Sequence, residues 1–427
     1  MERNLLIAAV AAVCALLPCN IDAQRVLKPI YKIHSTPQTR TITIQGGMKT
    51  LGYFNCGVAI CVPNKGNRFV IDKTGNKLWD FPNEFGIAQN GVDDERLYFS
   101  DDRIVLIQKS KPYGRRTAMI VDKSGKIVKQ FERVNSASQF VDGVAYISLN
   151  KDKPANNIWG SQKVYEHFYV DVNGNVLSKT LPCYEDFFGG YHIFPLKDGL
   201  RRFYDKDKKA WGYCDAKCNV VIPAKFKTAK DFNDGLAAVR VDNDNWGYID
   251  GQGQFVINPI YSIEPGSFCC GVAAVKERTG RLHYINKQGQ IVWSASTDNE
   301  DYYNNYRDFG HKGYTLWTLR DKTYIVNTQF QKVASVDFNK MDHTVDTYSD
   351  LDCSGEIVRY YDNYMLYSAN GIRLLLDYKG NPLLTYSGAY GTLFTDGYAI
   401  GKSEDGKTPY YFNDKGEITI QFKDSQF

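Results

Sequence analysis

The stretch NWGYIDGQGQFVINPIY (residues 245–261) decides the fold. Apolar residues stand on both sides of the four letters Asp-Gly-Gln-Gly, which run from Asp250 to Gly253. The Asp side chain can cap such a turn with its oxygen, while glycine takes the left-handed position of a type I turn followed by a bulge. We therefore predict a β-hairpin here, in which Ile249 lies opposite Phe255.

The same turn chemistry recurs along the chain. An apolar strand, an Asp or Asn, two residues, a Gly and a second apolar strand can be aligned at nine positions, spaced by roughly 35 to 50 residues. These registers begin at Asp72, Asp122, Asp171, Asp215, Asp250, Asn286, Asn327, Asp377 and Asn413. Self-similarity at this period indicates a repeat architecture rather than separate globular domains.

Pairing residues outward from each turn indicates how the hairpins pack. It places Tyr248 opposite Val256 and, in AMIVDKSGKIV (118–128), Ile120 opposite Val128. Successive pairs point to opposite faces of a sheet, and here both faces are largely apolar. We therefore expect each hairpin to be covered on both sides by neighbouring repeats.

Two of the nine turns lack the glycine. Cys218 and Phe330 stand in its place, where a Cβ should cost of order 1 kcal/mol, so these turns are expected to be either strained or of another shape. Cys214 and Cys218 flank one of them. A disulfide can be drawn across that turn, and two unpaired buried thiols fit the sequence equally well.

A further apolar strand precedes each hairpin, so the repeat is expected to hold three or four strands. It is clearest in SQFVDGVAYISL (138–149), DFNDGLAAVRV (231–241), SFCCGVAAVKE (267–277) and TLFTDGYAIGK (392–402). Trp211-Gly212 and Trp246-Gly247 lie four positions before their turn Asp. We expect the indoles to lie across the adjoining repeat and the glycines to admit a neighbouring backbone.

The segments WGYCDAKCNVVIPAKF (211–226) and DFNDGLAAVRVDNDNWGYIDGQGQFVINPIY (231–261) resemble the WG-repeat family. Its unit combines Trp-Gly-Tyr-Ile-Asp, a Gly turn, Phe-Val-Ile-Pro, a Tyr, and Phe-x-x-Gly-Leu-Ala-Ala-Val, and the match extends from about 194 to 293. Elsewhere Trp-Gly is absent at the equivalent places, and Trp159-Gly160 lies twelve residues before its Asp. The resemblance implies a bacterial, often exported, β-rich repeat protein with a binding role, and it brings no catalytic residues.

These observations predict an all-β chain of tandem β-hairpin repeats in a β-propeller-like array, with an open superhelical β-repeat or solenoid as the alternative. The array of about nine repeats would span residues 51–427, and residues 24–50 would form a leader. That leader contains RTITIQ (40–45), a strand with no turn partner of its own. If this strand completes the last repeat, it closes a ring and removes an exposed sheet edge.

The first residues, 1–23, have the pattern of a secretory signal peptide. Arg3 precedes an apolar run, and Ile21-Asp22-Ala23 provides a cleavage site before Gln24. A lipid anchor on Cys19 is disfavoured, because Pro18 precedes it where a small residue is needed. No later apolar run reaches the ~18 residues needed to span a bilayer. Export to the periplasm, the cell surface or the medium is therefore expected, with no transmembrane segment after signal removal.

Charge and motifs argue against several functions. A net charge of +4, with both signs interspersed, does not suggest a nucleic-acid partner. The six histidines show no metal-ligand spacing and GxSxG is absent, so no metal, cofactor or catalytic residue is predicted. Paired carboxylates serve glycoside hydrolysis only across a cleft of set width, which leaves a glycan-active enzyme as an alternative.

The remaining signal is an excess of tyrosine, with 30 residues in the chain. Tyrosine and phenylalanine suit strands and inter-repeat cores, which explains most of them. Insertions between repeats tend to gather on one face, where exposed Tyr and Trp can stack on sugars or anchor a protein interface. The candidate ligand-binding residues are therefore Tyr302, Tyr303, Tyr306 and Trp159. We expect a non-catalytic scaffold that binds an envelope protein, a host protein or a glycan. Besides the glycan-active enzyme, a purely structural envelope component is a further alternative.

Overall fold

The fold is described from a computed structural model of the 427-residue chain. The residues described are 33–88, 98–109, 115–151, 165–178, 184–185, 191–241, 245–295, 308–319, 322–336, 357–360, 364–369, 372–378, 382–387, 394–403 and 407–424. All regular elements in these segments are β-strands. A helix long and apolar enough to cross a membrane does not occur among them.

The strands are β1 (His34–Ile44), β2 (Met48–Leu51), β3 (Val58–Pro63), β4 (Phe69–Asp72), β5 (Lys77–Asp80), β6 (Phe85–Ile87), β7 (Arg103–Gln108), β8 (Arg116–Asp122), β9 (Ile127–Ala137), β10 (Val144–Asn150), β11 (Tyr165–Asp171), β12 (Val176–Ser178), β13 (Tyr184–Glu185), β14 (Tyr191–His192), β15 (Arg201–Asp205), β16 (Ala210–Cys214), β17 (Val220–Phe226), β18 (Thr228–Ala229), β19 (Ala237–Arg240), β20 (Trp246–Ile249), β21 (Phe255–Tyr261), β22 (Val272–Lys276), β23 (Leu282–Asn286), β24 (Ile291–Ser294), β25 (Tyr314–Leu319), β26 (Lys322–Asn327), β27 (Lys332–Val336), β28 (Ile357–Tyr360), β29 (Tyr364–Ala369), β30 (Ile372–Asp377), β31 (Pro382–Ser387), β32 (Tyr398–Lys402), β33 (Pro409–Asn413) and β34 (Glu417–Asp424).

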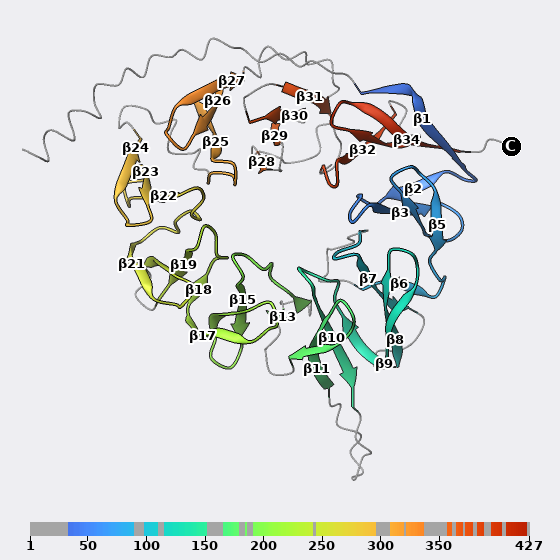
Figure 1. Ribbon diagram of the computed structural model, residues 1–427, viewed down its shortest axis with the longest axis horizontal. Coiled ribbons are helices and arrows are strands. Elements are labelled where there is room, and N and C mark those ends of the chain that lie inside the picture. Colours follow the sequence, from blue (N-terminus) through green and yellow to red (C-terminus); the bar gives the residue numbers. More distant parts are fainter. Residues whose placement is uncertain are drawn as a thin grey trace, which may run out of the picture.

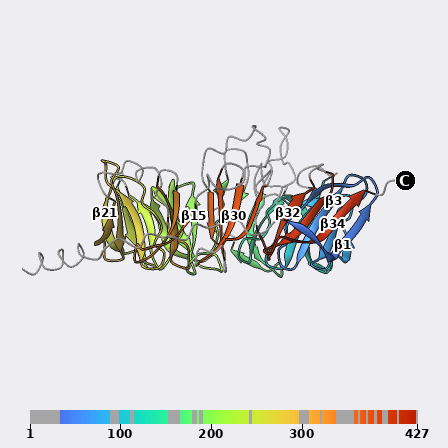
Figure 2. The same ribbon diagram turned by 90° about the horizontal axis from the view of Figure 1, so that it is seen from above.

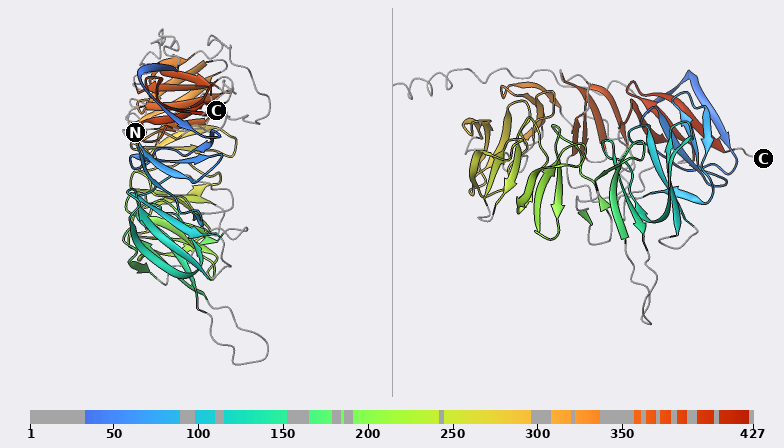
Figure 3. Two further views of the ribbon diagram at one scale, coloured as in Figure 1. Left: turned by 90° about the vertical axis from the view of Figure 1, so that its right-hand side faces the viewer. Right: turned by 60° about the horizontal axis from the view of Figure 1, so that its bottom comes forward.

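These strands form small sheets that follow one another around a ring (Figure 1). The repeats comprise β2–β5, β6–β9, β9–β12, β15–β17, β18–β21, β22–β24, β25–β27, β28–β31 and β32–β34, and the second and third of them share β9 in one seven-stranded sheet. Seen along its edge the ring is a flat disc (Figure 2, Figure 3). In the repeat β22–β24 the first strand lies toward the centre and the last toward the rim (Figure 1). The predicted all-β, propeller-like array is therefore confirmed.

The hairpins expected at the nine registers are present, because each turn joins two paired strands. Between β20 and β21, Oδ1 of Asp250 accepts hydrogen bonds from the backbone N–H groups of Gln252 (3.0 Å) and Gln254 (2.9 Å). Gly253 has a φ of +76°, in the left-handed region. A short polar side chain and one permissive residue therefore set the geometry of the turn.

In the hairpin of β20 and β21, the predicted pairing of Tyr248 with Val256 is wrong. Tyr248 lies opposite Ile257 rather than Val256, and the hairpin of β8 and β9 shows the same shift. A bulge beside the turn places two residues of the outer strand opposite one of its partner, so the register slips by one residue. Val256 is consequently 46% exposed. The expectation that both faces of each hairpin are covered is thus wrong for the outermost strands.

Cys218 and Phe330 keep the turn shape that glycine has elsewhere, with φ values of +64° and +61°. Their N–H groups donate to the carbonyl oxygens of Asp215 (3.0 Å) and Asn327 (2.8 Å), the same bond as in the glycine turns. The expectation of a strained backbone at these two turns is therefore confirmed, and that of a different turn shape is wrong. Cys214 and Cys218 are buried free thiols, so the disulfide drawn across this turn is not formed. The Cys214 thiol instead donates to a carbonyl of β15 at 3.5 Å.

Hydrophobic packing joins each repeat to the next. One core cluster, for example, contains Trp246 and Ile257 of one repeat together with Ala273 and Ile285 of the following one. Tyrosines two positions before the turn add hydrogen bonds across the same boundaries. These bonds run from Tyr213 to Lys230 O (2.7 Å), from Tyr248 to Gly266 O (2.7 Å) and from Tyr411 to Gly52 O (2.6 Å). The tyrosine side chain thus fills the core with its ring and fastens the next repeat with its hydroxyl.

The two ends of the described chain meet in one sheet. β1 pairs in parallel with β34, and the register runs from Arg40 opposite Ile420 to Ile44 opposite Asp424. β1 therefore lies outside the last repeat, at the rim (Figure 1). Because Tyr411 also donates to the first repeat, the last repeat is held to the first by the same bond that joins the internal repeats. We call the junction of β1, the last repeat and the first repeat the seam.

Candidate binding surfaces

The Trp-Gly pairs lie where β16 and β20 begin, and they serve the framework of the repeat. Trp246 is 5% exposed and packs in one cluster with Phe268 of the next repeat. A Cβ on Gly247 would lie only 2.6 Å from the carbonyl oxygen of Ile257 in β21, and Gly212 faces β17 in the same way. The backbone that comes close is therefore the outermost strand of the same repeat.

The turn glycine, by contrast, faces the preceding repeat. A Cβ on Gly253 would lie 2.9 Å from the Ile222 side chain, and one on Gly125 would lie 2.8 Å from the Trp79 ring. The Trp79 indole N–H donates across this boundary to the carbonyl oxygen of Lys123 at 3.0 Å. Close approach between repeats thus depends on the glycine of the turn, which also needs its positive φ.

Trp211 is half-buried and lies in a cation–π arrangement. The Arg202 guanidinium carbon is 5.4 Å from the centre of its ring and 4.3 Å from that of Phe194. Nε of Arg202 lies 2.8 Å from a carboxylate oxygen of Asp231 in the next repeat. Burial raises the pKa of Asp231, and the guanidinium charge opposes that rise. This set of side chains connects two repeats, as the Trp246 cluster does.

Exposed apolar side chains are most frequent on the outermost strands of three successive repeats, β17, β21 and β24, which follow one another along the rim (Figure 1), whereas β5, β9, β12 and β27 each carry one. We call them the outer wall: Val220, Val221, Phe255, Val256, Ile260, Ile291 and Val292. Ile260 is the most exposed of them, at 64%. Monomeric proteins seldom gather large apolar side chains on one surface, and such gatherings mark interaction sites. The outer wall is therefore a candidate docking surface.

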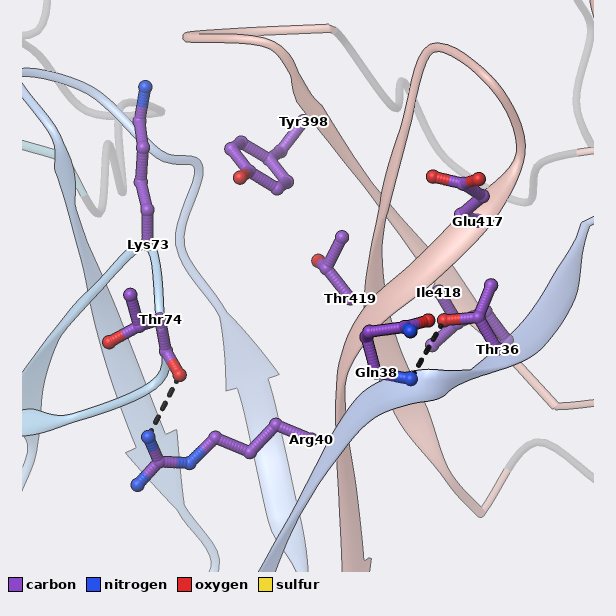
Figure 4. Close-up of a pocket in the computed structure, with 9 residues that line it drawn as sticks. All are labelled: Thr36, Gln38, Arg40, Lys73, Thr74, Tyr398, Glu417, Ile418 and Thr419. Atoms are coloured by element: carbon purple, nitrogen blue, oxygen red, sulfur yellow. Dashed lines mark hydrogen bonds between the residues drawn. The ribbon is translucent and has the colours of Figure 1, made fainter.

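A pocket of about 540 Å³ lies at the seam. It is lined by Thr36, Gln38 and Arg40 of β1, by Lys73 and Thr74 of the turn between β4 and β5, by Tyr398 of β32, and by Glu417, Ile418 and Thr419 of β34. In Figure 4 the first repeat contributes one side and the last repeat the other, with the Arg40 side chain reaching from β1 toward Thr74. Its volume lies within the ~300–1,000 Å³ of small-molecule sites.

One set of side chains has the bonding order of a catalytic triad. Ser294 Oγ lies 2.7 Å from Nδ1 of His283, and Nε2 of His283 lies 2.8 Å from a carboxylate oxygen of Glu277. The hydrogen bond from His283 lowers the pKa of Glu277. However, His283 is only 4% exposed and these residues do not line the seam pocket. Their bonds connect β23, β24 and the loop before β23, which is a structural role.

The candidate residues Tyr302, Tyr303, Tyr306 and Trp159 lie outside the described residues, so an aromatic face there stays a prediction. Within the described segments, no cluster of three or more His, Cys, Asp or Glu side chains could hold a metal ion. Sequence reasoning missed both surfaces. Pro223 and Pro259 were the available signal for the outer wall, since proline inside a strand marks a sheet edge. The seam pocket had no local signal, because its residues come from both ends of the chain.

Comparisons with known proteins add a family match and distant structural likenesses. A family model described as WG containing repeat matches residues 211–243 and 246–278, which confirms the predicted resemblance there. Among curated proteins there is no match.

Several solved structures are similar to this chain at low identity. BamB from Moraxella catarrhalis has 12% identity and a TM-score of 0.35, over 83% of this chain and 98% of that one. A eukaryotic initiation factor has 11% identity and a TM-score of 0.46, over 82% and 90%. The Dos1 propeller has 12% identity and a TM-score of 0.34, over 92% and 97%. With identities and TM-scores this low, these likenesses carry no argument about function.

Proposed function

We propose that this chain, which carries two WG-containing repeats in a ring of β-sheets, is a non-catalytic exported scaffold that binds a protein partner at the cell envelope. The observation that carries the proposal is the outer wall. Its seven apolar side chains lie on strands that end their sheets, and all of them are at least 39% exposed.

Three features support a protein partner over a small ligand at this surface. The outer wall is convex, because it follows the rim of the disc (Figure 1). It extends over three repeats, which suits an extended interface better than a compact molecule. Valine and isoleucine also dominate it, and such aliphatic side chains bury well against another protein but make no polar contacts to a sugar.

Export is part of the same proposal, and it rests on the sequence of residues 1–23. A basic residue, an apolar run and a small-residue cleavage site in that order direct secretion. The N-terminus of the mature protein purified from its native host should therefore be Gln24. Mass spectrometry of that N-terminus is the direct check, and an intact Met1 would contradict export through this signal.

The binding test compares a variant inside the outer wall with a variant outside it. The double variant Val256→Ser/Ile260→Ser removes two side chains of the outer wall, and Ile127→Ser removes an apolar side chain of β9 that is 51% exposed but lies outside the wall. All these side chains are exposed, so melting temperatures should match that of the wild type.

Each immobilised protein is exposed to solubilised envelope extract, and retained proteins are identified by mass spectrometry. A partner retained by the wild type and by Ile127→Ser, but reduced about tenfold or more by the double variant, supports the proposal. Equal retention by all three proteins would show that the outer wall does not carry binding.

A further inference from the structure

We infer that the seam pocket binds a saccharide that carries a carboxylate group. This goes beyond the proposed function, because it concerns a different surface and a different class of ligand. Neither the outer wall nor any Trp-Gly pair contributes a residue to the pocket. A negative result for the outer wall would therefore leave the proposal for the seam pocket unaffected, and the reverse also holds.

The cationic side of the pocket is built to meet an anion. Nη1 of Arg40 donates to the carbonyl oxygen of Thr74 (2.9 Å) and to Oδ1 of Asn76 (2.7 Å). Both acceptors are neutral, so they orient the guanidinium without cancelling its charge. The Nε and Nη2 groups carry three further N–H donors, whose planar fork matches the two oxygens of a carboxylate.

Lys73 lies on the same side, where its positive charge is paired with a carboxylate. Its ammonium nitrogen lies 3.0 Å from Oδ1 of Asp396 and 5.6 Å from the centre of the Tyr398 ring. Asp396 compensates most of the ammonium charge, so Arg40, whose acceptors are neutral, supplies the net positive charge of this side. The lysine thus holds Tyr398 beside the cationic side of the pocket.

The opposite side of the pocket is an acceptor. Glu417 receives a hydrogen bond from Nδ2 of Asn413 at 2.8 Å, on Oε2, which fixes the direction of the carboxylate. Its other oxygen can accept from a ligand hydroxyl. A small inorganic anion would be repelled by this carboxylate, whereas the hydroxyl groups of a sugar would be bound by it. The threonine hydroxyls of the lining extend the same polar surface.

These groups together specify the ligand class. An acidic sugar has a carboxylate for Arg40, hydroxyls for Glu417 and the threonines, and an apolar C–H face for the ring of Tyr398. Neutral sugars lack the first of these features, sulfate lacks the last two, and hydrogen phosphate, which keeps a hydroxyl, lacks the apolar face. Of these ligand classes, the carboxylate-bearing saccharide alone has all three features.

The position of the pocket couples binding to the closed ring. Its residues belong to β1, to the last repeat and to the first repeat, so a bound ligand touches all three parts of the seam. A ligand that binds only the closed form must stabilise it, to a degree that grows with ligand concentration. Binding should therefore slow hydrogen exchange of the β1 amides.

The test uses trigalacturonate as the acidic probe, its fully methyl-esterified form as a probe with the same ring hydroxyls but no charge, and inorganic phosphate as a simple anion. Affinities for the purified full chain are measured by titration calorimetry. We expect trigalacturonate to bind, and the ester and phosphate to bind about tenfold more weakly or worse. Equal affinity for the ester, or tighter binding of phosphate, would overturn the inference.

Variants tie the binding to the pocket. Arg40→Gln should weaken trigalacturonate binding about tenfold or more, and Arg278→Gln, on an exposed arginine elsewhere, should leave it unchanged. Because Arg40 also holds the turn at Thr74, Lys73→Gln provides a second variant at a side chain that is 39% exposed. Unchanged affinity in both pocket variants, with melting temperatures like the wild type, would place the ligand elsewhere and refute the assignment.

Discussion

The hydroxyl of Tyr411 is expected to hold the ring closed, and removing it tests the seam at a single atom. Tyr411→Phe keeps the buried ring and deletes two contacts to the first repeat, the 2.6 Å hydrogen bond to Gly52 O and the hydrogen bond with the Cys61 thiol. Tyr411 is fully buried and Gly52 is buried too, so the carbonyl loses this donor in a place that water does not readily reach. Leaving a buried acceptor without its partner costs about 1–3 kcal/mol.

The matched control is Tyr248→Phe. Tyr248 is equally buried and donates to Gly266 O at 2.7 Å, across a boundary between two internal repeats. Both variants therefore lose the bond to a carbonyl of the next repeat, and Tyr411→Phe loses the weaker contact with the Cys61 thiol as well. The consequence differs, because a continuous chain joins the repeats on either side of Tyr248, whereas the two sides of the seam are joined only by non-covalent contacts.

Global unfolding is a poor measure of this difference. With ~2.1 cal/mol/K per residue, a chain of 427 residues has an unfolding entropy of roughly 0.9 kcal/mol/K, so a loss of about 2 kcal/mol would shift the melting temperature by only ~2 K. Native-state hydrogen exchange is more direct, because it reports local opening. A loss of about 1–3 kcal/mol corresponds to about 5- to 150-fold faster exchange.

We therefore expect those amides of Arg40–Ile44 that donate to β34 to exchange about 5- to 150-fold faster in Tyr411→Phe. The same amides should keep their wild-type rates in Tyr248→Phe. If they are unaffected in Tyr411→Phe, or accelerate equally in both variants, the tyrosine bond does not hold the seam and the reasoning is wrong.

Three further predictions concern the repeat itself. Gly247→Ala should destabilise the protein by about 1–3 kcal/mol, because its Cβ would lie 2.6 Å from a backbone oxygen. Gly251→Ala is the control, since its Cβ would meet only a side chain at 3.8 Å. Equal urea midpoints for the two variants would contradict this prediction. Burial raises the pKa of Asp171, but hydrogen bonds from Asn175 and Asn173 outweigh it and lower the pKa overall, so the carboxylate stabilises the fold above its unfolded pKa of about 3.9 and this contribution is lost as the pH falls. Asp171→Asn, which keeps an acceptor oxygen, should therefore lose less stability than the wild type in denaturation between about pH 6 and pH 3, and identical pH profiles would count against the cap. The hydrogen bond between the two thiols raises the pKa of Cys214 and lowers that of Cys218, so the pKa alone would favour reaction at Cys218. Because both thiols are buried, neither should react with a thiol reagent until the protein unfolds, and rapid labelling of either in the native state would contradict that burial.

The repeat could be predicted from the sequence because its signals are local. An Asp and a Gly three positions apart, such as Asp250 and Gly253, determine a turn whatever surrounds them. Cys218 illustrates the limit of such a signal: it adopts the glycine conformation because the neighbouring strands are already paired around it. Local sequence preference therefore explains the glycine turns, whereas strand pairing holds Cys218 in a conformation that its side chain disfavours.

What the sequence could not provide was the register of the strands beyond the first pair of each hairpin. The bulge that moves Tyr248 opposite Ile257 depends on the hydrogen bonds of a finished turn, so counting residues outward missed the slip and the outward side of Val256. Gly247 was expected to mark a contact between repeats, but a second irregularity in β21 brings the backbone of the same repeat against it. The seam pocket needs contacts between the two ends of the chain, and no periodic pattern encodes such contacts.

The parallel pairing of β1 with β34 also has a mechanical consequence. If force pulls the chain outward before β1 and after β34, the two strands are drawn in opposite directions along their common axis, because they run the same way. All the hydrogen bonds of the register from Arg40 to Ile44 then carry the load together, and none can be peeled off ahead of the others. The seam is thus loaded in shear, and tension between the two ends of the ring would have to break it as a unit.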